Sequence, residues 1–142
     1  MLRRMLIAHA ESVAVVAVEG DELVVVRQRR AGAKDMTTEL PSGKVDAGEG
    51  PDEAARRELA EECGLEARDW RRLGAFWAVP AYSTEFVHVY EAVGLSPATG
   101  AVDLDEDEEL EPGRVPLGAA LGALSDAVSI AALALWRERG SR

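Results

Sequence analysis

Several features are scarce in this chain of 142 residues, and each shortage excludes a class of protein. The single cysteine, Cys63, has no partner for an intramolecular disulfide, which fits a reducing cytoplasm. No apolar run reaches the roughly 20 residues that a membrane-spanning helix needs. Residues 1–12 (MLRRMLIAHAES) are too short and too polar for a secretory signal. We therefore expect a cytoplasmic protein without a membrane partner.

Positive charge is also scarce. The chain has 16 Lys and Arg residues against 26 Asp and Glu residues, for a formal net charge of −10. Domains that bind nucleic acids usually carry a basic face, so we expect no nucleic-acid partner. Acidic residues concentrate between Asp103 and Glu111, where seven of nine positions are Asp or Glu. An acidic protein that handles a polyphosphate would need metal ions and a few arginines to overcome repulsion.

The length suits one domain, residues 1–142, with a proper core. Two β-branched runs joined by Glu-Gly-Asp-Glu predict a hairpin, and two later segments predict further strands. The segments are Ser12–Val18 and Leu23–Gln28 for the hairpin, Trp70–Val79 for one or two strands, and Glu85–Val93 for another. We expect a loop over Asp103–Glu111, a helix opening at Pro116, and a closing helix over Ser125–Arg139. The order of elements favours an α/β fold, built as an α/β/α sandwich.

One segment, GKVDAGEGPDEAARRELAEECGL from Gly43 to Leu65, carries most of the functional signal. Pro51 suits the first position of a helix, and Gly64 suits a left-handed stop, so we predict a helix over Pro51–Cys63. An apolar stripe on this helix faces the core, at Ala55, Leu59 and Cys63. A stripe of glutamates lies beside it, at Glu58 and Glu62 with Glu61 close by.

Three carboxylates within one helical turn repel one another, and a cation would relieve that repulsion. Hard divalent cations such as Mg²⁺ take oxygen ligands and often share carboxylates with substrate phosphates. The alternative is a solvated acidic helix face. The helix alone does not decide between the two, although the glycines, Arg57 and Glu49 stand at fixed intervals around the glutamates.

Written as a pattern, the segment is G-x5-E-x7-R-E-U-x-E-E-x-G-U, where U is a bulky aliphatic residue. It resembles the box of the Nudix hydrolases at every defined position. The resemblance implies a Nudix-type α/β/α sandwich with a mixed central sheet.

The resemblance extends along the chain from Ser12. The stretch VVVRQRRAGAKDMTTELPSGKVDAGEGP is similar to the approach to the box in ADP-ribose pyrophosphatases. Pro80 lies fifteen residues beyond Leu65, close to a proline marker of that subfamily, and Ser83-Thr84-Glu85 resembles its next strand. This implies hydrolysis of ADP-ribose, or a related nucleoside diphosphate sugar, to a nucleoside monophosphate and a sugar phosphate. Oxidised or ordinary nucleoside triphosphates and dinucleoside polyphosphates are alternative substrates, and a catalytically silent nucleotide sensor is a third hypothesis.

Roles for the box residues follow from the resemblance. Glu58 and Glu62 would bind Mg²⁺, for which Mn²⁺ is a possible substitute, helped by Glu61 and the backbone carbonyl of Ser42. Arg57 would orient Glu58 or Glu61 by a salt bridge, and Glu49 would anchor that network. The subfamily usually has alanine where this chain has Ser42.

Roles outside the box also rest on the resemblance. A glutamate of the acidic loop would activate the attacking water, and Glu108 is favoured over Glu106. Phosphate contacts would come from Arg27 and Arg29, because a guanidinium matches phosphate oxygens. The remaining substrate contacts would be Glu39, Pro80, Tyr82 and Glu85.

The family also implies a homodimer. Many ADP-ribose pyrophosphatases use a longer N-terminal region to hold the adenine across the dimer, and only about eleven residues precede the first predicted strand here, so base recognition is open. Trp77 and Tyr82 flank Pro80 and are candidates either for stacking on a base or for packing. We expect His88 to be a hydrogen-bonded structural residue and His9 to be an uninvolved surface residue.

Overall fold

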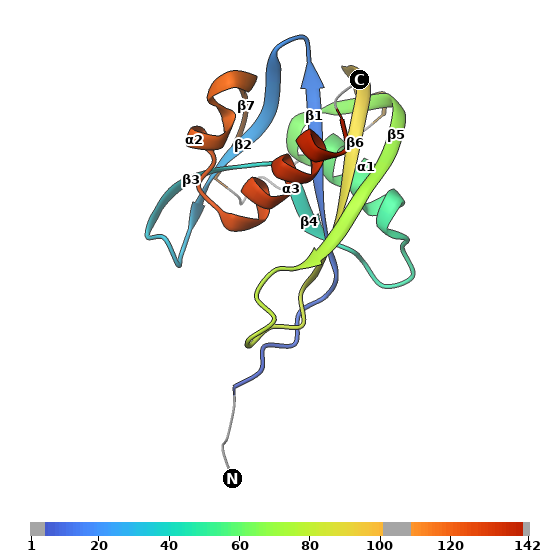
Figure 1. The fold of residues 1–142 in the computed structure, drawn as a ribbon. Helices are drawn as coiled ribbons and strands as arrows, with labels where there is room; N and C mark the ends of the chain where they lie inside the picture. Colours follow the sequence, from blue (N-terminus) through green and yellow to red (C-terminus); the bar gives the residue numbers. More distant parts are fainter. Residues whose placement is uncertain (1–4, 101–108, 141–142) are drawn as a thin grey trace.

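The computed structural model describes residues 5–100 and 109–140, and these form a mixed β-sheet between helices (Figure 1). The main path of the sheet has the order β3-β2-β1-β6-β5, while β4 pairs with β1 and β7 pairs with β2. Strands β1 and β6 run parallel, and the other pairs are antiparallel. The strands are β1 Ser12–Glu19, β2 Glu22–Arg30, β3 Asp35–Glu39, β4 Ser42–Lys44, β5 Leu65–Trp77, β6 Phe86–Pro97 and β7 Leu110–Pro116.

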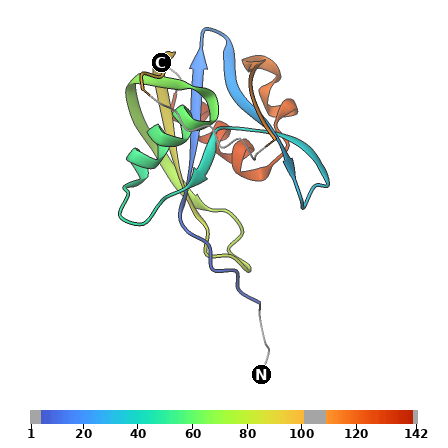
Figure 2. The ribbon, with the colours of Figure 1, turned by 180° about the vertical axis from the view of Figure 1, so that it is seen from behind.

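Helix α1 (Pro51–Cys63) covers one face of the sheet and helix α3 (Ala127–Glu138) covers the other. Figure 1 shows α3 in front of β1, and Figure 2, from behind, shows α1 there instead. A short 3-10 turn (Leu117–Ala119) and α2 (Ala120–Ala123) precede α3. This layering confirms the expected α/β/α sandwich with a mixed sheet.

Strand β1 is buried on both of its faces. Val13 and Val15 pack beneath α1, whereas Ala14 and Val16 belong to the core beneath α3. Side chains alternate along a strand, so a continuous apolar run can supply both cores. The β1–β2 hairpin turns at Gly20, which has a φ of 63°.

Helix α1 has the predicted bounds. Pro51 stands at its first turn, and Gly64 ends it in the left-handed conformation, with its N–H donating to the carbonyl of Ala60 at 2.8 Å. A residue with a Cβ atom adopts this conformation at a cost, which is why glycine suits the position. The helix buries Ala54, Ala55 and Leu59.

Three strands were not expected from the sequence: β3, β4 and β7. Strand β7 contains Leu110 and Glu111, which the sequence analysis placed in a loop, and residues 101–108 of that acidic stretch lie outside the described part. Strand β5 is also longer than expected, because it begins at Leu65 rather than Trp70 and bends at an irregularity between Arg72 and Gly74.

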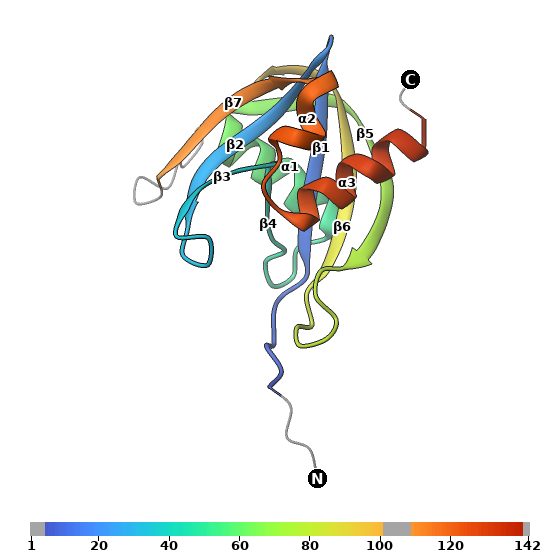
Figure 3. The ribbon, with the colours of Figure 1, turned by 60° about the vertical axis from the view of Figure 1, so that its left-hand side comes forward.

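The N-terminal segment runs beside the β5–β6 connection (Figure 3). The backbone N–H of Ile7 donates to the carbonyl of Tyr82 at 2.6 Å, and the N–H of Thr84 donates to the carbonyl of Ile7 at 3.0 Å. Across the described residues, the helices are all too short or too polar to cross a lipid bilayer.

Candidate functional site

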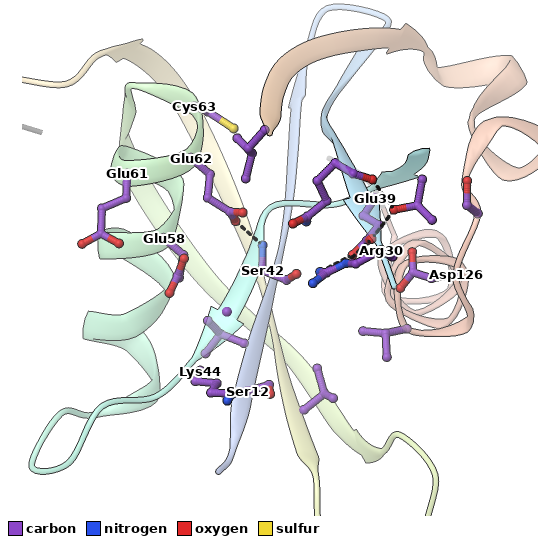
Figure 4. Close-up of a pocket in the computed structure, with 18 of the residues that line it drawn as sticks. Ser12, Arg30, Glu39, Ser42, Lys44, Glu58, Glu61, Glu62, Cys63 and Asp126 are labelled. Carbon is purple, nitrogen blue, oxygen red and sulfur yellow. Dashed lines mark hydrogen bonds and ion pairs between the residues drawn. The ribbon is translucent and has the colours of Figure 1, made fainter. Parts of the chain in front are cut away.

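A cavity of about 1230 Å³ opens between α1 and β4 on one side and β2, β3 and the start of α3 on the other (Figure 4). Its first wall carries the carboxylates of the box, and its second wall carries Arg30, Glu39 and Asp126. Strand β4 crosses between the two walls and places Ser42 near the middle. The chain therefore brings residues from both ends of the sequence to one polar cavity.

Glu58 and Glu62 point from α1 toward β4, while Glu61 lies on the outer side of the helix (Figure 4). An oxygen of Glu62, Oε1, accepts a hydrogen bond from the N–H of Ser42 at 2.7 Å. The Glu58 side chain is only 12% exposed, whereas Glu61 is 39% exposed. Burial raises the pKa of Glu58 to about 7, against the opposing effect of Arg57, and Glu61 and Asp46 raise it further.

Arg57 is the hub of this wall. Its Nε donates to Glu49 at 2.8 Å, and its Nη1 donates to Glu58 at 2.8 Å and to Glu61 at 3.1 Å. Its Nη2 also donates to the backbone carbonyl of Lys44 at 2.9 Å. Hydrogen bonding to Glu49, and then to Glu58, raises the pKa of Arg57, and the same bond lowers the pKa of Glu49. Arg57 thus makes the ion pairs that the family resemblance implies for it.

The donor set of this wall fits a hard divalent cation, since it consists of carboxylate oxygens beside the backbone of Ser42. Gly43 adds a second sign of fit, because a Cβ atom at this position would overlap the carboxylate of Glu58. Within residues 5–100 and 109–140, three or more acidic, His or Cys side chains nowhere gather into a ready metal cage. Arg57 holds Glu58 and Glu61, and the Ser42 amide holds Glu62, so the carboxylates would turn toward a cation on binding it.

The second wall centres on a buried glutamate, Glu39. Arg30 approaches it with two parallel hydrogen bonds, Nε to Oε2 and Nη2 to Oε1, both 2.8 Å. The hydroxyl of Thr37 lies 2.5 Å from Oε2 of Glu39. Although burial opposes it, hydrogen bonding to Arg30 and Thr37 lowers the pKa of Glu39. The wall therefore presents a fixed guanidinium to the cavity.

Arg27 and Arg29, the arginines predicted to contact phosphate, do not line the cavity. Gln28 and Arg30 line it instead, because alternate side chains of β2 point to the same face. Arg29 forms an exposed ion pair with Glu109 at 3.3 Å. The two-residue period of the strand was the signal that could have identified Arg30.

The remaining predicted contacts are spread out. Glu85 lines the cavity, where it accepts a hydrogen bond from Ser12 at 2.6 Å and lies 4.0 Å from Nδ1 of His9. Pro80 and Tyr82 are exposed in the β5–β6 connection and do not line the cavity. His9, expected to be an uninvolved surface residue, does line it. Glu106 and Glu108 lie outside the described residues.

Three other expectations concern packing. His88 is buried and lies within hydrogen-bonding distance of Arg72, with Nδ1 to Nη1 at 2.9 Å, as expected of a structural residue. The ring of Trp77 packs on Phe86, with centroids 4.8 Å apart. Cys63 packs against the core beneath α1 and also borders the cavity, and burial raises the pKa of its thiol to about 12.

Known proteins resemble this chain in both sequence and structure. The profile of the NUDIX domain matches residues 8–133. The ADP-ribose pyrophosphatase of Bacillus subtilis (strain 168) is 38% identical over 120 residues, and the methanol dehydrogenase activator of Bacillus methanolicus is 37% identical over 120 residues. Both alignments cover 84% of this chain and 65% of the relative, so the chain spans about two thirds of the length of these relatives.

Two further matches cover more of the relative. The ADP compounds hydrolase NudE of Escherichia coli (strain K12) is 32% identical over 140 residues, covering 95% of this chain and 74% of that protein. A crystal structure of an ADP compounds hydrolase superposes with a TM-score of 0.83 at 31% identity, covering 96% of this chain and 75% of that one.

Proposed function

This chain belongs to the NUDIX family, and on that premise we propose that it hydrolyses the diphosphate of ADP-ribose or a related nucleoside diphosphate sugar. The observation that carries the proposal is the pairing of two walls across one cavity: carboxylates suited to a divalent cation face a fixed arginine suited to phosphate. Relatives named as ADP-ribose pyrophosphatase and ADP compounds hydrolase support the choice of substrate class.

In this proposal, the first wall would hold Mg²⁺ through Glu58, Glu61 and Glu62, with the backbone carbonyl of Ser42. When bound, the ion would neutralise phosphate charge and lower the pKa of the attacking water, and Mn²⁺ could replace it. Arg57 holds Glu58 and Glu61 in place from behind, because its guanidinium contacts both. Arg57 is thereby a positioning residue.

The reaction is the attack of water on one phosphorus, with cleavage of the bond to the bridging oxygen. It yields a nucleoside monophosphate and a sugar phosphate. Glu108 is the proposed general base, with Glu106 as the alternative, and this assignment rests on the resemblance of the acidic stretch. A carboxylate that accepts the water's proton accelerates such a step by about 100- to 10,000-fold.

Arg30 is the residue of the second wall that we assign to the substrate's phosphate. Its Nε and Nη2 are engaged by Glu39, so the guanidinium plane is fixed while the rest of its edge faces the cavity. Glu39 acts through Arg30 in this assignment. We assign Glu85, which also lines the cavity, to the uncharged part of the substrate.

We also propose that the protein works as a homodimer in the cytoplasm. Large apolar side chains are exposed along the N-terminal segment and the β5–β6 connection, namely Met5, Leu6, Ile7, Trp77, Val79 and Tyr82. Burial of such a patch against a second copy would remove apolar area from water. A monomeric mass in light scattering would overturn the dimer.

The test of function is a Mg²⁺-dependent hydrolysis panel. Its substrates are ADP-ribose, other nucleoside diphosphate sugars, diadenosine polyphosphates and nucleoside triphosphates. We expect preferential release of AMP from ADP-ribose and a loss of several orders of magnitude in Glu62→Gln. Preference for triphosphates would overturn the substrate class and keep the hydrolytic chemistry.

A further inference from the structure

Asp126, at the start of α3, borders the cavity beside Arg30 and is not accounted for by the metal site or the phosphate contact. One of its oxygens, Oδ2, caps the helix by accepting the N–H of Ser129 at 3.1 Å. The other oxygen, Oδ1, is buried and has no hydrogen-bond partner among the described residues. Buried acceptors left without a donor are rare and costly, so such an atom calls for a reason.

The start of α3 is held firmly against β3 and the turn that follows it. The backbone N–H of Thr38 donates to the hydroxyl of Ser125 at 2.9 Å, and the N–H of Ser125 donates back to the carbonyl of Thr38 at 2.9 Å. The N–H of Leu40 donates to the buried hydroxyl of Ser129, also at 2.9 Å. The backbone that carries Asp126 is therefore held in place relative to β3, the strand that carries Glu39.

Among the described residues, no donor near Asp126 is placed to reach Oδ1. Arg30 directs Nε and Nη2 to Glu39, and the hydroxyl oxygen of Ser129 accepts the N–H of Leu40. Burial raises the pKa of Asp126, hydrogen bonds from Ser129 oppose that shift, and the nearby carboxylate of Glu39 adds to it. A ligand in the cavity can supply the missing donor after a small rotation of the carboxylate, whose terminal torsion is soft.

Charge decides which part of a diphosphate substrate meets this oxygen. A phosphate group placed against Asp126 would face its carboxylate and that of Glu39, so the phosphates belong at the free edge of Arg30, on the side toward the cation. A sugar hydroxyl is neutral and carries a proton to donate, which is what a carboxylate oxygen accepts.

We propose that Asp126 is a specificity-determining residue that accepts a hydrogen bond through Oδ1 from a sugar hydroxyl of the substrate. The inference rests on the proposed function and adds the chemical group that the second wall recognises. It predicts that the enzyme distinguishes substrates by a hydroxyl adjoining the diphosphate, in addition to the diphosphate itself.

Two variants of Asp126 remove or alter the acceptor Oδ1 while they preserve the helix cap that the residue provides. Asp126→Ser keeps one capping oxygen and deletes the second, and Asp126→Asn keeps the shape but can present an N–H₂ donor where the acceptor was. Serine, asparagine and aspartate cap helices about equally well, so both variants should fold. Asp69→Ser, which alters an exposed carboxylate of β5, is the matched control. Thermal unfolding checks that all three variants are folded.

The experiment measures kcat/KM with three substrates: ADP-ribose, its analogue with 2′-deoxyadenosine, and the methyl ester of ADP, which lacks the distal sugar. Both Asp126 variants should lose about 10- to 100-fold on ADP-ribose, the range for a hydrogen bond to a charged group. The loss should shrink to about twofold or less on the analogue that lacks the recognised hydroxyl, because the partner is then already missing. Asp69→Ser should match the wild type throughout.

An equal loss on all three substrates, or no loss on any, would overturn the role of Asp126. The same would follow if Oδ1 were satisfied by a bound water alone in a crystal structure with ADP-ribose. Calorimetric binding of ADP-ribose by the wild type and both variants separates this inference from the function. An intact protein that binds but hydrolyses none of the substrates would refute the proposed function, while weaker binding by the variants would still support the role of Asp126.

Discussion

The carboxylate of Glu58 packs against Gly43, in the position that a Cβ atom on residue 43 would need. The glycine of the box therefore does more than relax the backbone of β4. It leaves room for a buried carboxylate to reach the cavity from α1, and Arg57 holds that carboxylate from the other side.

Gly43→Ala should displace Glu58 and weaken activity about 10- to 100-fold, the range typical of changes that misplace a metal ligand. The expected signature is a higher Mg²⁺ concentration for half-maximal rate, with a small fall in melting temperature. Gly118→Ala is the control, since a Cβ atom there meets nothing within 4 Å. An unchanged Mg²⁺ dependence in Gly43→Ala would contradict the prediction.

Arg57→Lys keeps a positive charge but loses the fork that contacts Glu49, Glu58 and Glu61 together. We expect kcat to fall about 10- to 100-fold, while the melting temperature changes by only a few degrees. Steady-state kinetics at saturating Mg²⁺ and a thermal scan measure the two quantities. Arg56→Lys changes an exposed neighbour on the same helix and should retain the wild-type kcat. A wild-type kcat in Arg57→Lys would contradict the role of Arg57 in positioning the glutamates.

The pKa of Glu58 predicts how the stability of the metal-free protein depends on pH. Burial raises this pKa from 4.5 to about 7, so the folded state keeps a proton that the unfolded state releases between those values. The contribution of Glu58 to the free energy of unfolding is therefore present below about pH 4.5 and is lost as pH rises through about 7.

Relative to Glu58→Gln, the wild type should lose about 2 to 3 kcal/mol between pH 4.5 and pH 8 in a metal chelator. Urea unfolding of both proteins at the two pH values measures the difference. A wild type that gains stability over Glu58→Gln across this interval would reverse the sign and refute the prediction.

Arg30→Ala should leave Glu39 buried without its cation and destabilise the fold by about 1 to 3 kcal/mol, less than for a fully buried pair because the Arg30 side chain is 49% exposed. The double variant with Glu39→Gln should recover part of that loss, since the uncompensated charge is gone. Denaturant unfolding of the single and double variants measures both effects.

The same arginine should also control substrate affinity. We expect Arg30→Ala to raise KM about 10-fold or more, whereas Arg27→Ala and Arg29→Ala should change KM by less than about twofold. Similar increases in KM for all three variants would contradict the assignment of the phosphate contact to Arg30, the arginine on the cavity side of β2.

The sequence predicts the elements whose signals are local. Pro51 and Gly64 mark the two ends of helix α1, and runs of β-branched residues identify β1 and β2 as strands. Strand β7 has no such local signal, because it contains Pro112, Gly113 and Pro116. It forms by pairing with β2. Short β4 likewise depends on its partner, β1.

The site likewise has one part that local sequence signals predict and one part that depends on the tertiary fold. The carboxylates of α1 are fixed by helical spacing, so the sequence places them correctly beside the cavity. The second wall joins β2, β3 and the start of α3, which only the tertiary fold brings together. Arg30 was missed in favour of its neighbours, and Asp126 gave no signal beyond that of a helix cap.

The hydrogen bonds from Thr38 and Leu40 to Ser125 and Ser129 span 87 and 89 residues of sequence. Ribosomes add roughly 5–20 residues per second, so about 4 to 18 seconds pass between the synthesis of β3 and the synthesis of the α3 residues that hydrogen-bond to it. The box helix is translated in full during that interval, yet the wall facing it is incomplete. If the proposed function holds, the site is thus completed late in synthesis, and a nascent chain with an intact box would not yet be active.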